Sequence, residues 1–109
     1  MNNTELSLDQ LVTKIAKWGY DRKITTNGKV EAQMLKLTEE VGELAGAIAK
    51  KKATKTADGI GDVTVVLIMI CELKGLDFHA CVQHAYNEIK DRKGYLSPEG
   101  VFIREEPAS

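Results

Sequence analysis

The chain has 109 residues, of which 43% are apolar and 28% are charged, and its formal net charge at pH 7 is −1. This length predicts one compact domain with a modest core, so association between subunits is plausible. The near-neutral charge gives no argument for binding a nucleic-acid polymer, and no apolar run reaches the roughly 20 residues that span a bilayer.

The N-terminal segment MNNTELSLDQ lacks the basic and then apolar order of a signal peptide. We therefore expect a soluble cytoplasmic protein with no membrane partner. Cys71 and Cys81 form neither a CxxC pair nor a disulfide framework. Their apolar helical surroundings predict buried free thiols.

The hydrophobic pattern predicts an all-α four-helix bundle. A first helix over about 7–21 begins at a capping box made by Ser7 and Gln10. Residues 23–29 have turn composition, and a second helix follows over about 30–51. Its apolar stripe is Val30, Met34, Leu37, Val41, Leu44 and Ile48. The lysines that suit the negative end of its dipole are Lys50, Lys51 and Lys52.

The next segment, 57–74, contains the run VTVVLIMIC, which is β-branched enough for a buried strand. We predict a central helix after a short turn over 53–56, because a lone strand would have no partner. Gly75 is the expected stop, and a fourth helix covers about 78–93. The tail, 94–109, has a Pro-Glu-Gly turn, so it is irregular, forms a small hairpin or contacts a partner.

Carboxylates gather on the second and third predicted helices. Glu39, Glu40 and Glu43 occupy adjacent turns, where like charges repel unless solvent or a cation neutralises them. Asp58 and Asp62 lie one turn apart, and Asp62 directly precedes the apolar run, so we expect it to be partly buried. Two antiparallel helices would bring both groups to similar depth. Oxygen ligands favour Mg²⁺ or Mn²⁺ over Zn²⁺, and the alternative is a solvated acidic face.

The fourth predicted helix adds polar and basic groups. Asn87 and Lys90 share a face, where an amide and a cation could meet phosphate oxygens. The alternative is that Lys90, Arg92 and Lys93 only favour the negative end of the helix dipole. Trp18 either stacks on a base or anchors a core or interface. A metal site together with basic residues indicates phosphoryl chemistry.

Three segments in this order, KLTEEVGELAGAI, DGIGDVTVVLIMI and AYNEIKDRKGYL, resemble the MazG-like all-α nucleoside triphosphate pyrophosphohydrolases. WGYDRKI also resembles the segment before their first motif helix, so the resemblance covers about residues 8–96. The family signature is Glu-Glu-x-x-Glu followed by Glu-x-x-Asp, and its other expected glutamate falls on Gly59. The matching acids are Glu39, Glu40, Glu43 and Asp62.

The resemblance implies hydrolysis of a nucleoside triphosphate to the monophosphate and pyrophosphate by a homodimer or homotetramer. It implies Mg²⁺, or Mn²⁺, held by Glu40, Glu43 and Asp62, with Asp58 as a substitute for the missing glutamate. Glu39 would orient or deprotonate the attacking water. The implied substrate-binding residues are Trp18, Lys36, Asn87, Lys90 and Arg92.

Gly59 leaves several outcomes open at this point. One alternative is that Asp58, water or substrate phosphate completes the metal site. Another is that metal affinity falls, and a third is that the chain binds nucleotide without turnover. A helical interaction or assembly protein is the remaining alternative.

Overall fold

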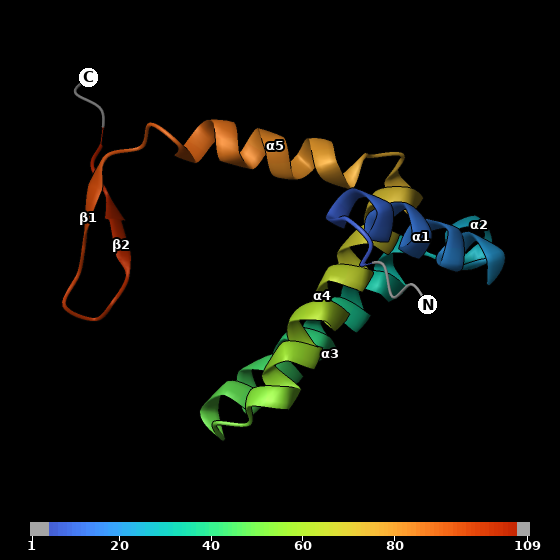
Figure 1. Cartoon of the computed structure of the whole chain (residues 1–109), viewed down its shortest axis with the longest axis horizontal. Helices are drawn as coiled ribbons and strands as arrows, with labels where there is room; N and C mark the ends of the chain where they lie inside the picture. The colour runs from blue at the N-terminus through green and yellow to red at the C-terminus, as the bar shows by residue number, and fades with distance from the viewer. Residues whose placement is uncertain (1–4, 107–109) are drawn as a thin grey trace. The chain divides into compact units, whose positions relative to one another are not determined.

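A computed structural model describes residues 5–106 of the chain (Figure 1). Most of this range is helical, which confirms the predicted class, and a small antiparallel hairpin follows the helices. The elements are α1 (Leu8–Asp21), α2 (Ile24–Asn27), α3 (Val30–Ala49), α4 (Ala53–Lys74), α5 (Phe78–Ile89), β1 (Gly94–Leu96) and β2 (Phe102–Arg104).

The chain divides after Phe78 into two compact units. The first contains α1 to α4, and the second contains α5 beyond its first residue together with the hairpin. The four-helix bundle and a single domain over residues 1–109 stay predictions. Among the described residues, no helix combines the length and the apolar character needed to cross a membrane.

The start of the chain follows its local sequence closely. Ser7 caps α1, donating its backbone N–H to Gln10 Oε1 at 2.8 Å and accepting the Gln10 N–H at Oγ at 3.1 Å. The predicted turn over 23–29 was wrong in part, because it contains the short helix α2. Lys23 adopts a left-handed conformation with φ of 63°, which ends the first helix and allows a new helical turn to begin.

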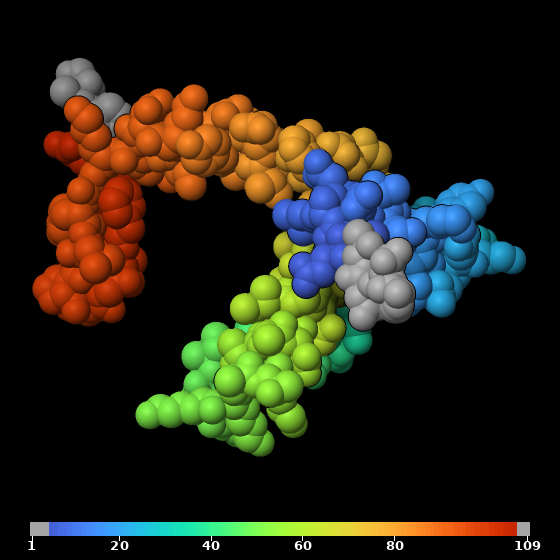
Figure 2. Space-filling model, in the orientation of Figure 1, coloured from blue at the N-terminus to red at the C-terminus, as the bar shows by residue number. Residues whose placement is uncertain are grey.

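The helices α3 and α4 lie side by side and run antiparallel (Figure 1). Their connection is shorter than predicted, because α3 ends at Ala49 and α4 begins at Ala53. Lys51, with φ of 55°, reverses the chain, and the Thr56 N–H already donates to the Lys52 carbonyl at 2.9 Å. The end of the pair that carries this turn, green in Figure 2, projects beyond α1 and α2.

The face of α3 that is covered by the rest of the protein differs from the predicted apolar stripe. Every second member is exposed, and Glu40 and Ala47 are buried instead. The exposed members are Met34, Val41 and Ile48. The partly covered members are Val30, Leu37 and Leu44. The covered row therefore runs through positions 37, 40, 44 and 47, because contact with α4 at Leu44 sets the rotation of α3.

The core of the first unit centres on α4, as its apolar run predicts. The buried apolar residues of this helix are Val66, Ile68, Met69 and Cys71. A Cβ at Gly19 of α1 would collide with the end of the Met69 side chain, so the glycine lets α1 and α4 approach closely without a shift of Met69. Gly75 ends the helix as predicted, with φ of 67° and the Leu76 N–H donating to the Cys71 carbonyl at 2.8 Å.

In the second unit, α5 ends four residues earlier than predicted, at Ile89. The Arg92 N–H donates to the Ile89 carbonyl at 2.9 Å, so the chain turns here and leads into β1. Lys90 and Arg92 therefore follow the helix, whereas Asn87 belongs to it. Cys81 on α5 is exposed, which corrects the prediction of two buried thiols, whereas Cys71 is buried as predicted.

The C-terminal tail forms the hairpin that was one of its predicted alternatives, so an irregular tail was wrong. Residue Tyr95 of β1 pairs with Ile103 of β2 in antiparallel register. The turn between the strands closes where the Ser97 N–H donates to the Val101 carbonyl at 2.7 Å, and Gly100 adopts φ of 88°. Gly100 suits this turn because it carries no Cβ.

Candidate active site

The predicted acidic residues of α3 and α4 line one pocket of about 680 Å³, which we call the acidic pocket. Its residues recur every three or four positions on each helix, so one face of α3 and one face of α4 form its walls. It is lined by Glu39, Glu40, Gly42, Glu43, Gly46, Ala47, Lys50, Lys52, Lys55, Asp58, Gly59 and Asp62. The fold thus brings together all five predicted acids.

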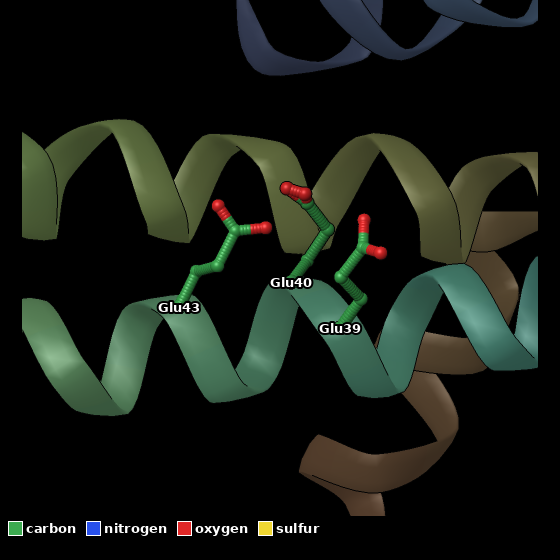
Figure 3. A group of neighbouring side chains, drawn as sticks. All are labelled: Glu39, Glu40 and Glu43. Atoms are coloured by element: carbon green, nitrogen blue, oxygen red, sulfur yellow. The ribbon is translucent and has the colours of Figure 1, made fainter.

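Three of these acids form a tight cluster on α3. Carboxylate oxygens of Glu39, Glu40 and Glu43 lie within 4.8 Å of one another. Figure 3 shows the three side chains extending from the same side of α3 in the direction of α4. Glu40 is only 8% exposed, while its two neighbours are exposed. The cluster therefore combines one shielded carboxylate with two that solvent reaches.

This cluster has little compensation from nearby cations. Lys36 Nζ lies 3.3 Å from Glu39 Oε1, and between residues 5 and 106 no salt bridge reaches Glu40 or Glu43. The hydrogen bond to Glu39, and then the negative charges of Glu39, Glu40 and Glu43, raise the pKa of Lys36 above its usual value. Three carboxylates this close repel one another, which favours binding of a cation.

The aspartates of α4 lie on the opposite wall of the acidic pocket. Asp58 and Asp62 both line it, and both are exposed. The expected partial burial of Asp62 was therefore wrong. Asp62 directly precedes the apolar run, but the buried residues of this run begin only one turn later, at Val66.

Gly59, where the signature expects a glutamate, is buried against α3. A Cβ at this position would lie 3.0 Å from Leu44 Cδ1, 3.2 Å from its Cβ and 3.3 Å from its Cα. These distances are shorter than ordinary van der Waals contact, so a larger residue would push the helices apart. The missing carboxylate is thus linked to close packing of the helix pair, and Asp58 beside it lines the same pocket.

A second pocket of about 660 Å³, the tryptophan pocket, adjoins the first. Trp18 and Lys36, both predicted to bind substrate, line it together. Its full lining is Leu11, Lys14, Ile15, Trp18, Lys36, Glu40, Asp62, Val65 and Val66. Glu40 and Asp62 belong to both pockets, so the shared carboxylates stand between an apolar cavity and the rest of the acidic pocket.

Trp18 is oriented by a neighbour on the chain. The guanidinium carbon of Arg22 lies 4.5 Å from the ring centroid, and Arg22 Nη1 donates to the Trp18 carbonyl at 3.2 Å. The tryptophan is 42% exposed, so it is no core anchor in this chain. The ring is available to a planar ligand in the tryptophan pocket.

The remaining predicted residues lie in the second unit. Asn87 accepts from Gln83 Nε2 at 3.1 Å on α5, and Lys90 and Arg92 follow that helix. Their part in substrate binding stays a prediction. Conversely, prediction assigned no site role to the lysines of the acidic pocket. The lysines of this pocket are Lys50, Lys52 and Lys55 in the segment KKKATK. The sequence predicted only a helix-dipole effect for Lys50 and Lys52, and no role for Lys55.

The donor atoms of the acidic pocket fit a hard divalent cation. Its candidate ligands are all carboxylates, three on α3 and two on α4, without a cysteine or histidine among the lining residues. Such oxygen sets suit Mg²⁺ and Mn²⁺, which also retain water or substrate phosphate as further ligands.

Comparison with known proteins identifies the family. A family model of the MazG nucleotide pyrophosphohydrolase domain matches residues 29–96, which include α3, α4 and all lining residues of the acidic pocket. The chain belongs to the MazG nucleotide pyrophosphohydrolase family.

One similar protein is described as an uncharacterized 18.2 kDa protein in the rep-hol intergenic region of Haemophilus phage HP1 (strain HP1c1). It is 36% identical over 70 residues, which make up 64% of this chain and 43% of that protein. The match therefore covers less than half of the phage protein. No solved structure matches the chain.

Proposed function

We propose that this protein hydrolyses nucleoside triphosphates to nucleoside monophosphates and pyrophosphate, with Mg²⁺ or Mn²⁺ as cofactor. The observation that carries the proposal is the cluster of Glu39, Glu40 and Glu43 facing two aspartates across the acidic pocket in a chain of this family. Hydrolysis adds water across the bond between the α-phosphorus and the oxygen that bridges it to the β-phosphorus. Pyrophosphate leaves with that oxygen.

The metal would be held by Glu40, Glu43 and Asp62, with Asp58 as a further ligand in place of a side chain at Gly59. These residues line one pocket and supply oxygen donors from both helices. A bound divalent cation supplies electrostatic stabilisation of the negative charge that develops on phosphate oxygens. The carboxylates themselves fix where the phosphates can enter, because a phosphate without a cation would be repelled here.

Glu39 is the proposed general base. It is the exposed member of the cluster that contacts Lys36, whose ammonium group holds its Oε1 at 3.3 Å. A carboxylate restrained at the edge of the pocket can orient a water molecule and accept its proton. Glu39 is therefore separate in role from Glu40 and Glu43, although all three share one helix face.

The tryptophan pocket would hold the base of the nucleotide. Trp18 offers an aromatic face, and Lys36 and the shared carboxylates mark the polar side of this cavity. Asn87, Lys90 and Arg92 are proposed as phosphate-binding residues by their resemblance to the family alone. Association as a homodimer or homotetramer is part of the proposal, because few apolar residues are buried within the described chain. Three apolar residues of α3 are left exposed and could be covered by such association. They are Met34, Val41 and Ile48.

The test is release of pyrophosphate from a panel of unmodified and modified nucleoside triphosphates in the presence of Mg²⁺ or Mn²⁺. Pyrophosphate and orthophosphate are measured separately, because only the former identifies the proposed bond. Glu40→Gln should lower the rate at least about 100-fold, since even outer-shell changes at metal sites cost 10–100-fold. Glu31→Gln, on the first turn of α3 and outside the pocket, should not. Absence of pyrophosphate from folded protein across the panel would refute the proposal.

Gly59 favours a second candidate, a homologue that binds metal and nucleotide without turnover. Its calorimetric signature is tight nucleotide binding without release of pyrophosphate. A helical assembly protein, in contrast, would bind neither Mg²⁺ nor nucleotide and would be indifferent to Glu40→Gln.

A further inference from the structure

The acidic pocket has a basic end that the proposed metal site does not use. Lys50, Lys52 and Lys55 line the pocket where α3 turns into α4. Lys50 follows Glu43 by seven positions in the sequence. At the rise of a helix, Lys50 thus lies roughly 10 Å farther along α3 than the last glutamate. A short chain of phosphate groups and a lysine side chain can together bridge that separation.

These three lysines are available to a ligand. All three are exposed, and the salt bridges found between residues 5 and 106 involve other cations. Carboxylates at one end of the pocket and unpaired ammonium groups at the other thus coexist without neutralising each other. Such a separation of charge suits a ligand that carries a divalent cation at one point and excess negative charge beyond it.

The order of the two pockets gives this ligand a direction. The tryptophan pocket and the acidic pocket share Glu40 and Asp62, so an aromatic cavity, the shared carboxylates and the lysines follow one another. We propose that Lys50, Lys52 and Lys55 bind the distal phosphates of the nucleotide and the pyrophosphate that leaves. This inference rests on the proposed function and assigns the polarity with which the substrate lies along α3 and α4.

A fourth lysine in the turn between α3 and α4, Lys51, provides a matched control. Lys51 lies between Lys50 and Lys52 in sequence, yet it lines a different pocket together with Ile48 and Ile60. Its left-handed conformation, with φ of 55°, directs the chain so that neighbouring lysines serve different surfaces. Replacement of Lys51 removes the same charge from the same turn without changing the acidic pocket.

The experiment titrates inorganic pyrophosphate into the protein by calorimetry in the presence of Mg²⁺. The variants are Lys51→Gln and the triple change Lys50→Gln, Lys52→Gln and Lys55→Gln. The triple variant should bind pyrophosphate at least about tenfold more weakly, because each charge-assisted hydrogen bond is a strong one. Lys51→Gln should stay within about twofold of the wild type. Binding of a nucleoside monophosphate should be unchanged in both variants.

The proposal is overturned if the wild type does not bind pyrophosphate, if the triple variant binds it as the wild type does, or if Lys51→Gln weakens binding equally. Far-UV circular dichroism establishes that the variants are folded, which is expected because the replaced side chains are exposed. Lysine-dependent pyrophosphate binding without any hydrolysis would refute the proposed function alone. If Glu40→Gln does not lower the rate of hydrolysis while pyrophosphate binding still depends on the lysines, the lysine site is supported and the proposed metal site is refuted.

Discussion

The contact between Gly59 and Leu44 predicts that replacement by alanine changes stability differently at two glycines of the same helix. Gly59 and Gly61 both lie within α4, where replacement of glycine by alanine ordinarily stabilises a helix by about 1 kcal/mol. A Cβ at Gly61 has no atom within 4 Å, whereas one at Gly59 would lie 3.0 to 3.3 Å from three atoms of Leu44. Only the methyl group added by Gly59→Ala must therefore displace atoms of the neighbouring helix.

The expected magnitudes follow from these contacts. Gly61→Ala should raise the free energy of unfolding by about 0.5–1 kcal/mol. At Gly59 the same gain is opposed by overpacking, which costs about 1–3 kcal/mol, so Gly59→Ala should be neutral or destabilising by up to about 2 kcal/mol. The difference between the variants, about 1–3 kcal/mol, is the quantity of interest. Both variants gain the same general stabilisation of a helix by alanine, so this contribution drops out of the difference.

Urea unfolding followed by far-UV circular dichroism measures both free energies at one protein concentration. Thermal unfolding provides a second measure, since 1 kcal/mol shifts the midpoint by about 4–8 °C in a domain of 60–100 residues. Equal stabilisation by Gly59→Ala and Gly61→Ala would refute the close helix packing at Gly59. It would then also remove the physical reason given for the absence of a glutamate there.

Two further predictions concern ligands. Mg²⁺ at about 100 times its dissociation constant should raise the free energy of unfolding of the wild type by about 2.7 kcal/mol, and Glu43→Gln should remove most of that gain. An equal Mg²⁺-dependent shift in thermal unfolding of both proteins would contradict Glu43 as a ligand. Trp18→Ala should weaken nucleotide binding by about 1–3 kcal/mol through loss of stacking, whereas Tyr20→Ala, on the same helix but outside the tryptophan pocket, should not. Calorimetric titration with a nucleoside triphosphate decides this, and unchanged affinity of Trp18→Ala would place the base elsewhere.

The parts of the fold that sequence predicts well are those that depend on local chemistry. Ser7 and Gln10 satisfy the first turn of α1, and Gly75 supplies the left-handed residue that ends α4, so both boundaries were correct. The parts that failed depend on contacts between distant residues. The rotation of α3, which buries Glu40 and exposes Val41, is set by α4 and cannot be read from the periodicity of one helix.

The candidate site shows the same division. The spacing of Glu39, Glu40 and Glu43 places them on adjacent turns in any helix, so their cluster was predictable. The exposure of Asp62 was not, because it depends on which side of α4 faces the neighbouring helices. The lysines of the acidic pocket were also missed, since their common surface exists only when α3 and α4 pair. The surface that these lysines share is therefore a property of the helix pair.

The close contact at Gly59 has a consequence for ion size. Where two helices meet through backbone and a leucine stem, the width between the acidic walls is set by rigid contacts and cannot adjust easily to a larger ion. Mg²⁺ demands short, regular ligand distances, whereas Ca²⁺ accepts longer and more numerous ones. We therefore expect a metal site built across Glu43 and Asp58 to favour Mg²⁺ over Ca²⁺. In that case a residue with no side chain would contribute to the choice of metal.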